Sequence, residues 1–185
     1  RGQLACDVCV VGLGGSGLSC VHELLDAGVD AIGIDAHIVA GGAAGRNGGF
    51  LLAGTYDFYH DAVERYGAAA ARRIYELTIE QIDRIATETP EAVRRTGSLR
   101  IAVDDEELRD CELQLEAMAA DGLPAERYAG PVGSGLLIPT DASFNPLLRA
   151  RLLARTAISR GARLFERSAA AEIEGARVMT RSAPR

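Results

Sequence analysis

A glycine motif between a predicted strand and a predicted helix constrains this chain most. Residues 5–11 form a run of small and β-branched side chains, which predicts a buried strand. Gly12, Gly14 and Gly17 follow in the spacing G-x-G-x-x-G, and apolar residues at helical spacing come next. Gly12 would permit a tight turn, Gly14 a close approach of a pyrophosphate, and Gly17 close packing of helix on strand. The motif therefore predicts a Rossmann-type unit with a dinucleotide at the helix N-terminus.

Asp35 supports this interpretation by its position. It ends a second short apolar run, 31–34, and lies eighteen residues after Gly17. A carboxylate there accepts hydrogen bonds from the adenosine ribose and disfavours the 2'-phosphate of NADP. The alternative interpretation is a glycine-rich turn that binds nothing, with Asp35 as a solvated residue at the end of the strand.

A second glycine-rich segment follows Asp35 and favours FAD over NAD. Residues 40–50 read AGGAAGRNGGF, which is too irregular for a helix and too apolar for a flexible linker. Its glycines would let backbone N–H groups lie along an extended cofactor, and Arg46 would balance the pyrophosphate charge. The alternative is an exposed turn with a solvated arginine.

Together these segments resemble the D-amino-acid oxidase-like FAD-dependent oxidoreductases, a family that includes glycine, sarcosine and gamma-glutamylputrescine oxidases. The resemblance rests on the sequences DVCVVGLGGSGLS, IGIDA and GGAAGRNGGFLLAG. It implies an α/β fold, with a Rossmann-like FAD-binding domain and the beginning of an inserted α+β substrate domain. It also implies FAD as cofactor and a small-molecule amine substrate, whose adjacent C–H bond is oxidised by hydride transfer to the flavin.

The resemblance implies specific cofactor-binding residues. The adenosine diphosphate half would lie on Gly12, Gly14, Gly15, Ser16, Gly17, Asp35 and Ala36. The pyrophosphate and the path toward the flavin would follow Ala43, Ala44, Arg46, Asn47, Gly48 and Gly49, and the backbone of Ala170 would contact the adenine. The family usually has Glu where this chain has Asp35 and Ser where it has Ala44. Those departures imply a shorter reach to the ribose and one phosphate contact fewer.

The catalytic residues stay unassigned. His22, His37 and His60 lack a partner at a meaningful spacing, so each is interpreted as structural or solvated. A non-catalytic nucleotide-binding module, or a truncated and inactive fragment of such an enzyme, is therefore the alternative function.

Composition excludes several classes of partner. The net charge of −6 comes without a concentrated basic face, which argues against nucleic acid. No apolar run approaches the ~20 residues of a membrane helix. The four cysteines are typical of a reduced, cytoplasmic protein. Cys6 and Cys9 would point to opposite faces of a strand, so no metal site is predicted.

The predicted domain organisation has three segments. Residues 1–96 would be the first segment of the FAD-binding domain, 97–135 the start of the substrate domain, and 136–185 a second, incomplete FAD-binding segment. The pattern predicts a hairpin that begins near Gly175 without its partner, and a strand at 97–103 with few neighbours. We therefore expect either a homo-oligomer or a C-terminal half outside these residues.

Local patterns predict individual elements. They indicate a helix over 68–87, a further helix starting at Thr89-Pro90, and a helix capped by Asp104. Residues 123–135, rich in glycine and proline, are expected to form a loop. Asn145 and Pro146 would start a helix that carries Leu148, Leu152 and Ile158, with strands at 163–165 and 171–174 after it.

Overall fold

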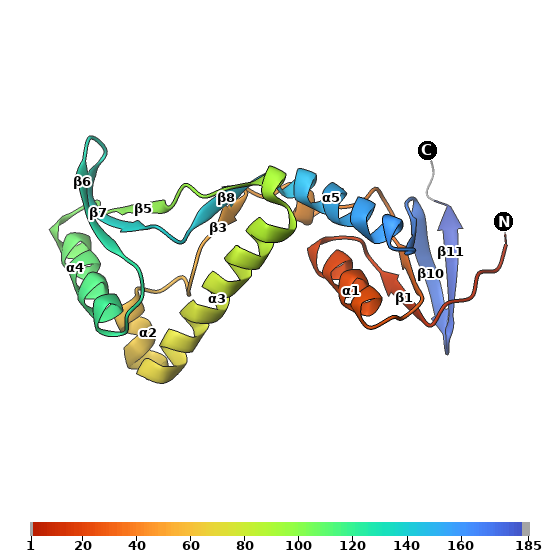
Figure 1. The fold of residues 1–185 in the computed structure, drawn as a ribbon, viewed down its shortest axis with the longest axis horizontal. Helices are drawn as coiled ribbons and strands as arrows, with labels where there is room; N and C mark the ends of the chain where they lie inside the picture. The colour runs from red at the N-terminus through yellow and green to blue at the C-terminus, as the bar shows by residue number, and fades with distance from the viewer. Residues whose placement is uncertain (1, 183–185) are drawn as a thin grey trace. The chain divides into compact units, whose positions relative to one another are not determined.

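The computed structural model describes residues 2–182, which form two compact units (Figure 1). Unit 1 comprises Arg1–Gly48 and Asn145–Arg185, and unit 2 comprises Gly49–Phe144. The predicted α/β class with a Rossmann-like N-terminal domain is confirmed. The assignment of 1–96, 97–135 and 136–185 to FAD-binding and substrate domains stays a prediction.

Unit 1 is built on a parallel sheet of order β1-β2-β9, formed by Val8–Val11, Ala31–Ile34 and Arg163–Phe165. Val8 pairs with Ala31, and Ile32 pairs with Arg163. All residues of β2 are buried, as expected for the middle strand of a covered parallel sheet. Helix α1, Gly15–Asp26, joins β1 to β2 and completes the predicted strand–turn–helix–strand unit.

Helix α5, Pro146–Ser159, packs against α1 through small side chains. The predicted cap is confirmed, because the Asn145 side chain accepts a hydrogen bond from Leu148 N at 2.9 Å. The predicted apolar residues do not form the buried face, since Leu148 and Ile158 are 37% and 56% exposed. Instead α5 buries Leu153 and three alanines, which allow the two helices to approach closely: Ala150, Ala154 and Ala157.

The expectation of a hairpin without its partner is wrong. Strand β10, Ser168–Glu174, pairs antiparallel with β11, Arg177–Ser182. Gly175 has a φ of 56° and so provides the left-handed residue of the tight connection.

An antiparallel sheet of order β5-β7-β6 lies in unit 2; it confirms one prediction and corrects another. The strand predicted at 97–103 is β5, Ser98–Ile101, and it lies at the edge of the sheet with β7, Gly133–Ile138, as its strand neighbour. The predicted loop over 123–135 contains β6, Glu126–Gly130, and the start of β7. Gly135 pairs with Ile101 within this sheet, and the position requires glycine because a Cβ there would lie 1.9 Å from the carbonyl oxygen of Arg100.

A smaller sheet of order β3-β8-β4 consists of Phe50–Leu51, Ala142–Phe144 and Val93–Arg94. The predicted helix at Thr89-Pro90 is wrong, because only the 3₁₀ turn η2, Pro90–Ala92, precedes β4. Thr89 belongs to the end of the preceding helix instead. Its N–H and its hydroxyl both donate to the carbonyl oxygen of Ile85, at 3.2 and 3.1 Å.

Three helices cover unit 2: α2, Tyr59–Tyr66; α3, Ala68–Glu88; and α4, Asp105–Ala120. The helix predicted over 68–87 is therefore confirmed. So is the cap at Asp104, which accepts hydrogen bonds from Glu106 N and Glu107 N at 3.0 and 2.8 Å. The core between helices and sheet includes Tyr59, Tyr75, Met118 and Leu136.

Asp141 is a buried carboxylate that joins separate segments of unit 2. Its side chain is 3% exposed. One oxygen accepts a hydrogen bond from Ala53 N at 2.8 Å, and the other accepts one from the Ser98 hydroxyl at 2.6 Å. Burial raises the pKa of the Asp141 carboxyl above its ordinary value of 3.8, and the two hydrogen bonds oppose that rise.

We expect Asp141→Asn to be at least as stable as the wild type at neutral pH. An amide keeps the acceptor for Ala53 N and offers a donor to the Ser98 hydroxyl, without a buried charge. Asp141→Ala leaves both groups unpaired and should lower the free energy of unfolding by about 2 to 4 kcal/mol.

Because the pKa of Asp141 is raised, the difference in stability between wild type and Asp141→Asn should depend on pH. Folded protein holds the Asp141 proton more tightly than unfolded protein, so this group's contribution to stability falls as pH rises from 3.8 through its raised pKa. Urea denaturation between neutral and acidic pH should therefore show the stability of wild type rising relative to Asp141→Asn as the pH falls. A wild type whose stability falls relative to that of Asp141→Asn on acidification would contradict this account.

Candidate cofactor site

The turn between β1 and α1 requires glycine at two positions. Gly12 has a φ of 97°, in the left-handed region, and its N–H donates to Ile34 O at 2.8 Å. At Gly17 an added Cβ would lie 1.8 Å from the carbonyl oxygen of Gly12. The first turn of α1 therefore lies directly against the strand end, as the motif predicts.

Gly14 is different, because nothing in the protein's own packing requires a glycine there. It is the N-cap of α1 with a φ of −82°. An added Cβ would meet only Ala44 Cβ, at 3.5 Å, an ordinary contact, and at Gly15 it would meet nothing within 4 Å. The missing Cβ leaves the backbone open to a ligand, which fits the close approach of a pyrophosphate.

The N-terminus of α1 is also electrostatically suited to an anion. Gly14 provides no side-chain cap, and the first turn contains no acidic residue. The first N–H groups of the helix and the positive end of its dipole thus face outward without a carboxylate, next to the exposed Ser16. This arrangement fits a phosphate group.

Asp35 lies beside the glycine turn and has a structural role that the sequence did not indicate. One carboxylate oxygen accepts a hydrogen bond from Leu13 N at 2.7 Å, and the other accepts one from His37 N at 2.8 Å. These bonds fix the carboxylate at the end of β2, where Ala36 is half-buried. Each oxygen retains a lone pair, so ribose hydroxyls can still donate to it.

The second glycine-rich segment returns to the same turn. Ala44 lies against Gly14 and packs on the core of unit 1, within the 3₁₀ turn η1, Ala43–Gly45. Gly45, which the sequence pattern did not predict as a required glycine, is required because a Cβ there would lie 2.3 Å from Ala40 O. Ala40 itself has a φ of 53° and donates its N–H to Leu13 O at 3.0 Å.

Arg46 and Asn47 have different environments at the end of this segment. The Asn47 side chain donates to Ala43 O at 3.2 Å and to Ala44 O at 3.1 Å, so it holds the turn together. Arg46 is exposed, and its guanidinium has no hydrogen-bond or ion-pair partner among residues 2–182. It is therefore available to an anionic ligand.

The remaining predicted positions lie farther along the chain. Gly48 is exposed, whereas Gly49 is buried, has a φ of 71° and accepts a hydrogen bond from Phe144 N at 2.8 Å. Ala170 is exposed on β10 beside a register irregularity. Hydrogen bonds and packing thus join Gly12–Gly17, Asp35 and Ala44, while the binding roles of all these residues stay predictions.

The histidines show no catalytic arrangement. His22 bonds through Nε2 to Leu153 O at 2.9 Å, and His37 is exposed. His60 lies 3.5 Å from Asp61 and 3.9 Å from Asp110. Within residues 2–182, no cluster of three or more His, Cys, Asp or Glu side chains suits a metal ion, and no helix is long and apolar enough to cross a membrane.

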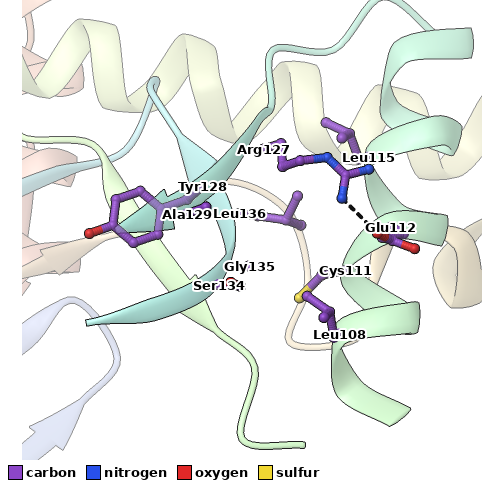
Figure 2. Close-up of a pocket in the computed structure, with 10 residues that line it drawn as sticks. All are labelled: Leu108, Cys111, Glu112, Leu115, Arg127, Tyr128, Ala129, Ser134, Gly135 and Leu136. Atoms are coloured by element: carbon purple, nitrogen blue, oxygen red, sulfur yellow. Dashed lines mark hydrogen bonds and ion pairs between the residues drawn. The ribbon is translucent and has the colours of Figure 1, made fainter. Parts of the chain in front are cut away.

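Unit 2 contains a small pocket between α4 and the β6–β7 hairpin, with a volume of about 110 Å³ (Figure 2). Leu108, Leu115 and Leu136 line it together with the buried Cys111. Burial raises the pKa of the Cys111 thiol, which keeps it protonated and unreactive at neutral pH. Figure 2 also shows the ion pair of Arg127 and Glu112, at 2.6 Å. The pocket offers apolar packing rather than reactive groups.

Known proteins resemble this chain over nearly its whole length. Residues 7–183 match the family described as FAD dependent oxidoreductase. Gamma-glutamylputrescine oxidoreductase from Escherichia coli (strain K12) is 32% identical over 188 residues, covering 93% of this chain and 44% of that protein.

Solved structures show the same fold. Glycine oxidase from Geobacillus kaustophilus matches with a TM-score of 0.72 and 20% identity, over 96% of this chain and 52% of that one. L-amino acid deaminase from Proteus vulgaris, with its specific insertion sequence deleted, matches with a TM-score of 0.74 and 16% identity. The match covers 96% of this chain and 50% of that one. This chain thus spans about half the length of the proteins that it matches. With its glycine turn, Asp35 and second glycine segment, the chain belongs to the FAD dependent oxidoreductase family, and its cofactor is FAD.

Proposed function

We propose that the protein oxidises the C–H bond next to the amine of an amino acid or other small amine. The observation that supports this most is the identity of 32% to gamma-glutamylputrescine oxidoreductase over 93% of the chain. Bound FAD supplies the two-electron oxidation. The match covers 44% of the length of that relative, so we propose the activity for the whole protein that contains these residues.

In this proposal the chain's own residues bind and orient the cofactor. The N–H groups at the start of α1 hold the pyrophosphate, and Asp35 holds the adenosine ribose. Ala36 lies with Asp35 at the adenosine half, and the backbone of Ala170 contacts the adenine. The residues that follow the pyrophosphate toward the flavin are Ala43, Ala44, Arg46, Asn47, Gly48 and Gly49. A cytoplasmic location is proposed from the four free cysteines.

Arg46→Ala should weaken FAD binding by about tenfold to a hundredfold, or roughly 1.5 to 3 kcal/mol, if its guanidinium pairs with the pyrophosphate. Stability without cofactor should hardly change, because Arg46 is exposed and unpaired among the described residues. Isothermal titration with FAD measures the difference. Arg155→Ala, another exposed arginine, on α5, is the matched control and should bind FAD like the wild type. Equal affinities for both variants would place Arg46 outside the site.

Visible spectroscopy of the purified protein tests the amine oxidation. We expect flavin absorption bands that bleach when an amine substrate is added without oxygen. The screen should contain D-amino acids, sarcosine, glycine and polyamines. A protein that binds FAD but is reduced by none of these amines would instead favour the non-catalytic nucleotide-binding module.

A further inference from the structure

The short turn between β9 and β10 contacts the segment that follows β2 through consecutive residues. Asp35 N donates to Phe165 O at 2.9 Å, and Ser168 N donates to Asp35 O at 2.7 Å. Arg167 N donates to His37 O at 2.7 Å. Arg167 has a φ of 51°, unusual for a non-glycine residue, so this turn is held in shape by its surroundings.

The side chain of Glu166 adds a further hydrogen bond between the β9–β10 turn and the segment that follows β2. Its carboxylate accepts a hydrogen bond from Val39 N at 2.8 Å, across 127 positions of sequence. Val39 is 9% exposed and this hydrogen bond is partly buried, so loss of the acceptor would leave a largely buried N–H without its partner. The next residue, Ala40, has a left-handed backbone and donates to Leu13 O in the glycine turn.

The contacts therefore form a continuous chain from Glu166 to the candidate site. Val39 is followed by Ala40, which bonds to Leu13, and Leu13 N bonds to the Asp35 carboxylate. The same segment leads into the second glycine loop, where Gly45 lies against Ala40 O. Movement of Val39 would consequently shift both the glycine turn and the loop that carries Arg46.

We propose that Glu166 is a positioning residue for the cofactor site: by accepting from Val39 N it holds the 37–42 segment in the conformation that receives FAD. The inference rests on the proposed FAD-binding role of this site. Glu166 acts through Val39 and Ala40 and does not itself contact the cofactor.

Three variants in the full protein test this role. Glu166→Ala removes the acceptor and should weaken FAD binding by about three- to tenfold, the effect of losing a hydrogen bond that preorganises a site. Glu166→Gln keeps an acceptor oxygen and should restore affinity close to that of the wild type. Glu174→Ala removes another exposed carboxylate, at the end of β10, and should leave affinity unchanged.

Hydrogen–deuterium exchange without cofactor provides a readout that does not depend on FAD. The amides of 37–42 should exchange faster in Glu166→Ala than in Glu166→Gln or Glu174→Ala. Equal exchange in all three variants would overturn the positioning role, as would equal FAD affinities. If the wild type binds no FAD while exchange in Glu166→Ala rises, the cofactor proposal fails but the bracing of this segment stands.

Discussion

Gly14→Ala should lower FAD affinity by about a hundredfold or more, equivalent to roughly 3 kcal/mol, while the folded protein stays intact. The new methyl group would meet only Ala44 within the protein, at 3.5 Å, so the packing accepts it. In the proposed site it would occupy space that the pyrophosphate needs to approach the backbone at the start of α1. Replacing glycine at an N-cap should change the free energy of unfolding by about 1 kcal/mol or less.

The measurement is a FAD titration paired with urea denaturation of the cofactor-free protein. A loss of affinity together with near wild-type stability assigns the glycine to ligand binding. Unchanged affinity would show that the phosphates do not approach Gly14, and the proposed position of the cofactor would be wrong.

Gly17→Ala should have a different effect, because here the protein itself needs the space. Its Cβ would lie 1.8 Å from Gly12 O and 3.5 Å from a Val10 methyl group, so α1 must move away from β1. We expect the free energy of unfolding to fall by about 3 kcal/mol or more, with FAD binding lost as the turn opens.

Gly15→Ala is the matched control for stability on the same helix. A Cβ at Gly15 meets nothing within 4 Å, and alanine is the better helix former, so cofactor-free stability should stay level or rise by up to about 1 kcal/mol. Urea denaturation compares the two variants. Equal stabilities would show that the close contact of Gly17 with Gly12 is not needed for the fold.

The features that the sequence predicted correctly are local ones. The glycine motif specifies its own turn, because Gly12 needs a left-handed backbone and Gly17 needs the absence of a side chain. The caps at Asp104 and Asn145 act within three residues, so their short-range pattern was sufficient.

Features that depend on distant packing were missed. The local pattern of prolines and glycines predicts a loop at Gly135, whereas the residue lies in a strand and its glycine provides the space that β5 needs. The buried face of α5 consists largely of alanines, whose importance appears only when α1 packs against them. No pattern within the sequence connects Glu166 to Val39, since 127 positions separate them.

In the proposed site, the turn at Gly12–Gly17 and the fixed carboxylate of Asp35 bind FAD. Isothermal titration calorimetry of the cofactor-free protein with FAD, NAD and NADP tests this binding. We expect saturable binding of FAD, much weaker binding of NAD, and no binding of NADP, whose 2'-phosphate would meet the Asp35 carboxylate. Saturable binding of NAD or NADP in preference to FAD would contradict the account.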